Sequence, residues 1–203
     1  MSLTNLITEC DDIVENFYNN GKGLRSTLLK NYTSGDGINT GMESVVENIL
    51  WKAVDEAGID RERVKINQDY FKGDSELDDP QRMDFHVWVD DLVVLVIESR
   101  AWIDKPFYTL KRAVVRNFME LPYVQRHLAD DVQFAFVALA ADYKDRLEHT
   151  LNKTMGYEDR VQTFKFSPYR RGHKGGNYFD FGFHKPGVKS LSAFLYDHLS
   201  RYK

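Results

Sequence analysis

Two carboxylates stand at the outer ends of two neighbouring apolar runs in MDFHVWVDDLVVLVIESR, residues 83–100. Asp84 precedes the first run, Glu98 follows the second, and Arg100 comes two residues later. Burying a carboxylate without a partner is costly, so packing alone does not account for these charges. Two neighbouring carboxylates repel each other unless a cation lies between them, and oxygen ligands of this kind suit Mg²⁺. Arg100 stays protonated, so we expect it to bind a phosphate and stabilise its charge rather than act as a base.

Whether Asp84 and Glu98 meet depends on the hairpin that joins their strands, because side chains alternate between the two faces of a strand. A two-residue turn at Asp90–Asp91 would put the two acids on opposite faces. A three-residue loop at 90–92 would pair Asp84 with Glu98 directly, with their Cβ atoms ~5 Å apart. The sequence leaves both possibilities open, and a shared metal site requires the longer loop.

A third acid comes from a helix that we predict over about residues 41–57, ending at Gly58 as the C-cap. At ~100° per residue, Glu43 falls inside the apolar arc of this helix, whereas Glu47 lies just outside it. A carboxylate on the buried edge of a helix is uncommon unless it is paired or bound to a metal, so Glu43 joins the candidate site, although for Glu43 alone a salt bridge or a snorkelling side chain is the favoured explanation. The apolar positions are Met42, Val45, Val46, Ile49, Leu50, Ala53, Val54 and Ala57.

The remaining elements follow from hydrophobic periodicity and turn residues. The strands around the two acids should form an antiparallel hairpin, and the helix that follows should make the next strand parallel to it. We therefore predict one domain over residues 1–203, of the α/β class, with a mixed central β-sheet flanked by helices. An amphipathic N-terminal helix would pack on this body or against a second subunit. The expected elements are a loop at 31–41, helices at 3–18, 105–121, 142–155 and 188–202, and strands at 63–71, 84–89, 92–99, 132–140 and 161–167.

Composition narrows the class of protein. The 203 residues, 42% of them hydrophobic, suffice for one domain with a sizeable core. We expect a cytoplasmic protein without a membrane partner, since no apolar run reaches ~18 residues, the N-terminus does not resemble a secretory signal, and the only cysteine is Cys10. The motifs typical of P-loop, Rossmann, serine-hydrolase and HExxH zinc enzymes are absent from the sequence.

Charge is unevenly distributed along the chain. Residues 1–100 carry 10 Lys and Arg against 20 Asp and Glu, whereas residues 101–203 carry 17 against 11. Either an acidic centre beside a basic contact surface or ordinary surface variation would produce this pattern. The basic and aromatic candidates for contact with DNA phosphates and bases lie on the 105–121 helix and in a segment at about 160–190, although a solvated stripe and a surface loop remain alternatives. They are Tyr108, Arg112, Arg116, Arg170, Arg171, His173, Lys174 and Asn177.

The pattern of Asp84, thirteen intervening residues and Glu98-Ser99-Arg100 resembles the PD-(D/E)XK nuclease superfamily, over about residues 41–140. The resemblance implies a restriction-endonuclease-like core of order αβββαβ and a metal ion held by Asp84 and Glu98. It places Arg100 at the lysine position and makes Glu43 the helix acid. The chain departs from the pattern at Met83, which replaces a proline, and at Arg100, which cannot be deprotonated to help activate water.

The resemblance implies a function for the whole chain. It points to a Mg²⁺-dependent type II restriction endonuclease that cuts double-stranded DNA at a specific, palindromic site, with residues 160–190 as a recognition segment. A palindrome suggests a symmetric homodimer, for which the N-terminal helix is one candidate interface. The alternatives are a structure-selective DNA repair or recombination nuclease and a catalytically inactive DNA-binding relative.

Overall fold

The computed structural model describes residues 2–23, 36–67, 84–103, 125–141, 160–166 and 185–203, which form a mixed α/β fold. Three helices and five strands make up the described part of the chain, together with two short 3₁₀ helices at Arg61–Arg63 and Ser200–Tyr202. The helices are α1 (Leu3–Gly23), α3 (Asp36–Ala57) and α7 (Lys185–Leu199). The strands are β1 (Val64–Asn67), β2 (Phe85–Val89), β3 (Leu92–Ile103), β4 (Leu128–Ala141) and β5 (Val161–Lys165).

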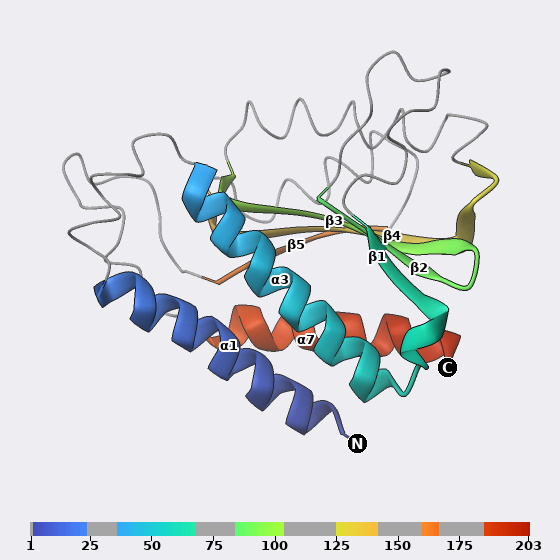
Figure 1. Ribbon diagram of the computed structural model, residues 1–203, viewed down its shortest axis with the longest axis horizontal. Coiled ribbons are helices and arrows are strands. Elements are labelled where there is room, and N and C mark those ends of the chain that lie inside the picture. The colour runs from blue at the N-terminus through green and yellow to red at the C-terminus, as the bar shows by residue number, and fades with distance from the viewer. Residues whose placement is uncertain (1, 24–35, 68–83, 104–124, 142–159, 167–184) are drawn as a thin grey trace, which may run out of the picture.

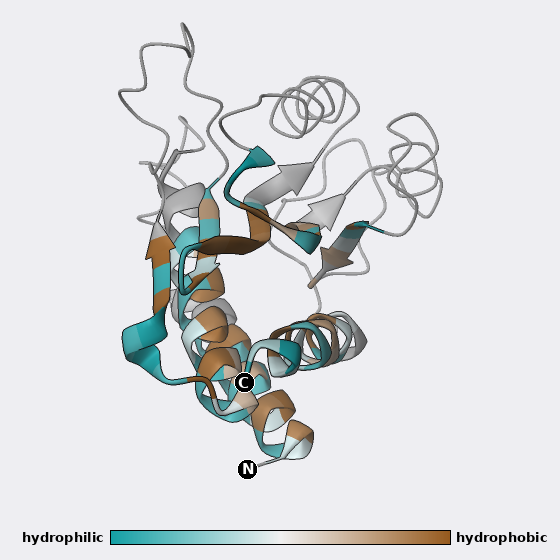
Figure 2. Ribbon diagram, turned by 90° about the vertical axis from the view of Figure 1, so that its right-hand side faces the viewer, coloured by the Kyte–Doolittle hydropathy of each residue, from teal (hydrophilic) through white to brown (hydrophobic). Residues whose placement is uncertain are grey.

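The five strands form one sheet in the order β1-β2-β3-β4-β5. Strands β1, β2 and β3 are antiparallel neighbours, whereas β3, β4 and β5 run parallel. The sequence predicted both the antiparallel hairpin and the parallel fourth strand, and both are confirmed. The edge strand β1 alternates apolar and polar residues, which Figure 2 shows as brown and teal bands, as expected where one face of a strand is buried.

All three described helices lie on the same side of the sheet (Figure 1). Helix α3 packs directly on β3 and β4, and α7 packs on β5. Helix α1 contacts α3 and α7, so its apolar stripe, including Leu6, Cys10 and Val14, is buried against its own chain. Of the two partners expected for this stripe, packing on the same chain is therefore confirmed. The homodimer remains a prediction, and its contact surface would have to lie elsewhere than on this buried stripe.

The apolar face predicted for the second helix is confirmed in full. All eight of its predicted apolar positions, from Met42 to Ala57, are buried in the core between the helices and the sheet. Full burial of one aliphatic side chain contributes about 1.5–3 kcal/mol to folding, so this face holds α3 on the sheet. The helix ends as predicted, because Gly58 takes a φ of 76° that only glycine adopts without strain.

Several predicted boundaries were wrong. Residues 36–41 are helical although we placed them in a loop on the strength of their two glycines, which have weak helix propensity. Strand β3 continues to Ile103 because it remains paired with β4 beyond the predicted end at residue 99. The predicted helices at 105–121 and 142–155 lie outside the described residues, as do 31–35 and 68–71 of the predicted loop and strand.

Candidate functional site

The turn between β2 and β3 has two residues, Asp90 and Asp91. The prediction of a three-residue loop, on which a shared site depended, was therefore wrong. Asp90 takes a φ of 55°, a left-handed conformation that aspartate tolerates better than most residues. The Arg63 guanidinium donates two hydrogen bonds, of 3.0 and 2.9 Å, to the Asp90 carboxylate. The backbone N–H of Asp90 also donates to the carbonyl of Arg63 at 2.8 Å. These contacts anchor the tight turn to the start of β1.

A bulge in β3 changes the register that this turn begins. Trp88 of β2 pairs with Val93, but Val87, the residue before Trp88, pairs with Leu95. Val94 is therefore an extra residue with no partner in β2, as in a β-bulge. From Val87 to Phe85, the strands therefore pair in the register that a three-residue loop would have produced.

Beyond the bulge, the register runs toward a pairing of the two predicted acids. The last pair of the hairpin joins Phe85 to Ile97, and continuing by one position places Asp84 opposite Glu98. Asp84 lies just outside β2, and its Oδ2 accepts hydrogen bonds from the backbone N–H of Ser99 at 2.7 Å and from the Ser99 Oγ at 3.1 Å. The carboxylate of Asp84 is thus fixed on β3 beside the residue that follows Glu98.

The acid at the end of the second apolar run is fully buried. Glu98 has an exposed fraction of 0%, and the neighbouring Ser99 is also 0% exposed. Glu98 alternates with Ile97, which belongs to the core under the helices, so its side chain belongs to the opposite face of the sheet. This face also carries His86, which is 1% exposed and pairs with Val96.

Two members of this site were missed by the sequence analysis. Ser99 was treated only as a spacer between Glu98 and Arg100, and His86 was not singled out. A signal for His86 was present, since it lies two residues from Asp84 in the same apolar run and period-two alternation puts both on one face. No signal identified Ser99, because its role depends on the register of the hairpin.

Glu43 is partly buried on α3, whereas Glu47 is exposed, in agreement with their predicted positions around the helix. Helix α3 packs on β3 and begins near the end at which β3 finishes (Figure 1). Among the residues that the structure describes, however, no three His, Cys, Asp or Glu side chains are grouped so that they could hold a metal ion. Glu43 is therefore not gathered with Asp84 and Glu98 into one metal-binding group.

The remaining candidates lie wholly or partly beyond the described residues. Arg100 continues β3 through its backbone, opposite Ala138 of β4, but its side chain is not among those described. All eight DNA-binding candidates, in 105–121 and 160–190, fall outside the description. They are Tyr108, Arg112, Arg116, Arg170, Arg171, His173, Lys174 and Asn177.

The donor chemistry of the site suits a hard cation. Asp84 and Glu98 offer carboxylate oxygens, and Mg²⁺ is commonly held by one or two carboxylates while it keeps several waters. Two carboxylates are therefore a sufficient protein ligand set for Mg²⁺, although not for a metal that needs three side chains.

A cavity lined by described residues lies elsewhere. It has a volume of about 530 Å³ and is lined by Glu9 of α1 and by residues between 52 and 60, around the C-terminal end of α3. Ion pairs border it, with Lys52 Nζ at 2.7 Å from Glu9 and Arg61 Nη2 at 2.6 Å from Asp55. None of its lining residues comes from β2 or β3, so this cavity is separate from the two buried acids.

The fold and the two candidate acids define an α/β protein with a buried carboxylate, Glu98, inside the central strand β3. Compared with known proteins, the sequence matches no protein-family model and no curated protein. Within the part of the chain that the structure describes, no helix is both long and apolar enough to cross a membrane.

Proposed function

We propose that this protein is a Mg²⁺-dependent endonuclease that hydrolyses phosphodiester bonds of double-stranded DNA at a specific site, as type II restriction enzymes do. The observation that supports the proposal is the hairpin register, in which Phe85 pairs with Ile97 despite a two-residue turn, so that its continuation by one position would bring Asp84 opposite Glu98. The element order supports it, since α3 precedes three antiparallel strands and β4 then lies parallel to β3. These elements occur in the order α, β, β, β and β that the αβββαβ core requires of them, and its second helix would fall between β3 and β4, outside the described residues.

Each member of the site would have a distinct role. Asp84 and Glu98 would hold Mg²⁺, which when bound lowers the pKa of a coordinated water and offsets charge on the phosphate. Ser99 orients Asp84 through its two hydrogen bonds, so the carboxylate is positioned before substrate arrives. Arg100 would bind the scissile phosphate as a permanent cation. By resemblance, the products would carry a 5′-phosphate and a 3′-hydroxyl.

The test is incubation of the purified protein with plasmid and phage DNA in the presence of Mg²⁺ or EDTA. Discrete fragments that require Mg²⁺ are expected, and mapping their ends gives the recognition site. Asp84→Asn and Glu98→Gln should each reduce cleavage on the order of 100-fold or more, since a metal ion contributes several kcal/mol to the barrier. Asp91→Asn is the matched control, because Asp91 is an exposed acid in the turn of the same hairpin.

One sequence feature favours a second candidate, a DNA-binding relative without catalysis. Arg100 stands at the position where the superfamily has lysine, and arginine cannot give up a proton. Retained DNA binding without cleavage, equal in Mg²⁺ and EDTA, would support this candidate and refute the endonuclease. Nicking or a smear without discrete bands would instead indicate a structure-selective nuclease.

A further inference from the structure

The bulge residue Val94 is skipped by both neighbouring strands. On the β2 side the pairing passes from Val93 to Leu95, and on the β4 side the same two residues pair with Leu128 and Gln133. The carbonyl of Val94 accepts a hydrogen bond of 2.8 Å from Nε2 of His198 on α7. Helix α7, far away in sequence, therefore supplies a hydrogen-bond donor to Val94, where the pairing of β3 with both β2 and β4 shifts.

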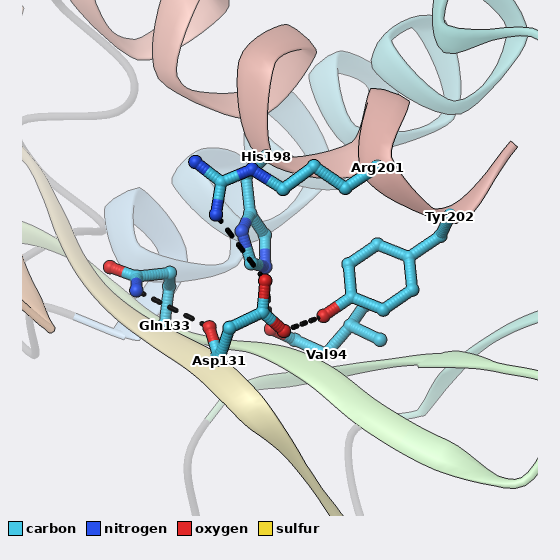
Figure 3. A network of polar contacts seen from close by, with 6 residues as sticks. All are labelled: Val94, Asp131, Gln133, His198, Arg201 and Tyr202. Atoms are coloured by element: carbon cyan, nitrogen blue, oxygen red, sulfur yellow. Dashed lines mark hydrogen bonds and ion pairs between the residues drawn. The ribbon is translucent and has the colours of Figure 1, made fainter.

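The same C-terminal segment also holds the irregular part of β4. Asp131 lies in the stretch of β4 that the shift leaves without partners in β3. Its carboxylate accepts hydrogen bonds from the hydroxyl of Tyr202 and, at 3.3 Å, from Nη1 of Arg201. Figure 3 shows these side chains converging on Asp131 beside Val94. We call His198, Arg201 and Tyr202 the C-terminal clamp.

The imidazole of His198 is held firmly in this position. It is 2% exposed, it stacks on Phe194 with an interplanar angle of 5°, and Tyr202 meets its ring edge-on with centroids 5.6 Å apart. The contact with a carbonyl oxygen requires that Nε2 carry the proton and donate it. Since a buried carbonyl that loses its donor is destabilising, His198 specifically favours the bulged arrangement of β3.

We propose that the C-terminal clamp sets the register of the candidate site. Without the bulge, the same two-residue turn would leave Asp84 and Glu98 on opposite faces of the sheet. By stabilising Val94 in the bulge, the clamp favours the register in which Asp84 reaches Ser99 and lies opposite Glu98. Its residues are positioning residues that lie away from the acids. Their effect on cleavage rests on the proposed function, whereas their effect on register does not.

The test compares His198→Phe, which keeps an aromatic ring but removes the donor, with His198→Gln, which keeps an N–H donor. Amide hydrogen exchange measured by NMR reports the register, because the Ser99 amide donates to Asp84 in the bulged pairing, and a one-residue shift would move Asp84 opposite Ile97. In His198→Phe, we expect the protection of Ser99 to fall about tenfold more than that of Ile49, a buried residue of α3 that reports global unfolding. In His198→Gln, Ser99 should stay within about threefold of the wild type.

The outcomes separate the clamp from the proposed function. Equal loss of protection at Ser99 and Ile49 in His198→Phe, or equal effects of the two substitutions, would overturn the proposal, since the clamp would then act only on global stability. If His198→Phe does not fold, Tyr202→Phe tests the clamp by the same comparison of protection at Ser99 and Ile49, because it removes only the hydroxyl that donates to Asp131. If the wild-type protein does not cleave DNA, the endonuclease is refuted while the exchange data still decide the clamp. If it does cleave, His198→Phe should lower kcat and His198→Gln should restore it.

Discussion

Replacing Asp84 by alanine should destabilise the fold, whether or not the protein is an enzyme. The substitution removes the acceptor of two hydrogen bonds from Ser99, at 2.7 and 3.1 Å, and Ser99 is 0% exposed. Hydrogen bonds to a charged group contribute about 1.5–3 kcal/mol each. Asp84 itself is only partly buried, so water would replace part of the loss. We therefore expect the free energy of unfolding to fall by about 2–4 kcal/mol.

Urea unfolding followed by circular dichroism measures this change, provided that the m-value stays constant. Asp91→Ala removes an exposed acid from the same hairpin and should change stability by less than about 0.5 kcal/mol. A double-mutant cycle with Ser99→Ala isolates the hydroxyl bond, for which we expect a coupling of about 1 kcal/mol. Equal effects of Asp84→Ala and Asp91→Ala, or a coupling of zero, would show that the Asp84–Ser99 contact does not contribute as described.

Three further predictions concern other parts of the fold. Gly58→Ala should cost about 1 kcal/mol in denaturant unfolding, because φ is 76° and the new Cβ would lie 3.2 Å from Lys203 Cε; no loss would contradict the proposed C-cap. Burial raises the pKa of the Cys10 thiol to about 11, so a thiol reagent at neutral pH should label Cys10 only as fast as the protein unfolds, and prompt labelling without urea would refute this. Burial also lowers the pKa of His198 below 6.5, against the opposing effects of its bond to Val94 and of Asp131. The folded state then binds fewer protons than the unfolded state, so this contribution to stability is complete above pH 6.5 and decreases as the pH falls below it. His198→Gln should remove that slope in unfolding experiments between pH 7 and 5, and an unchanged slope would assign it to another group.

The sequence by itself determined the local elements and the faces they bury. The eight apolar positions of α3 were all predicted from their three- and four-residue spacing, because a helix turns by a constant angle per residue. The apolar runs of β2, β3 and β4 likewise identified central strands. The two acids at the outer ends of the apolar runs pointed to Asp84 and Glu98 as candidate site residues, although β3 continues five residues beyond Glu98.

Only the tertiary structure decided the strand register between those acids. The hairpin has the short turn that would separate them, and the bulge at Val94 reverses that outcome. No local pattern marks Val94, which is one valine in a run of apolar residues, and its carbonyl is stabilised by His198, more than a hundred positions along the chain. In a run of apolar residues, each side chain can be buried on either face of the sheet, so the run itself does not fix the strand register. The register depends instead on the sum of contacts across the sheet and from the helix packed on it. Such contacts exist only once the chain has folded, and they place Asp84 against Ser99, the residue that follows Glu98.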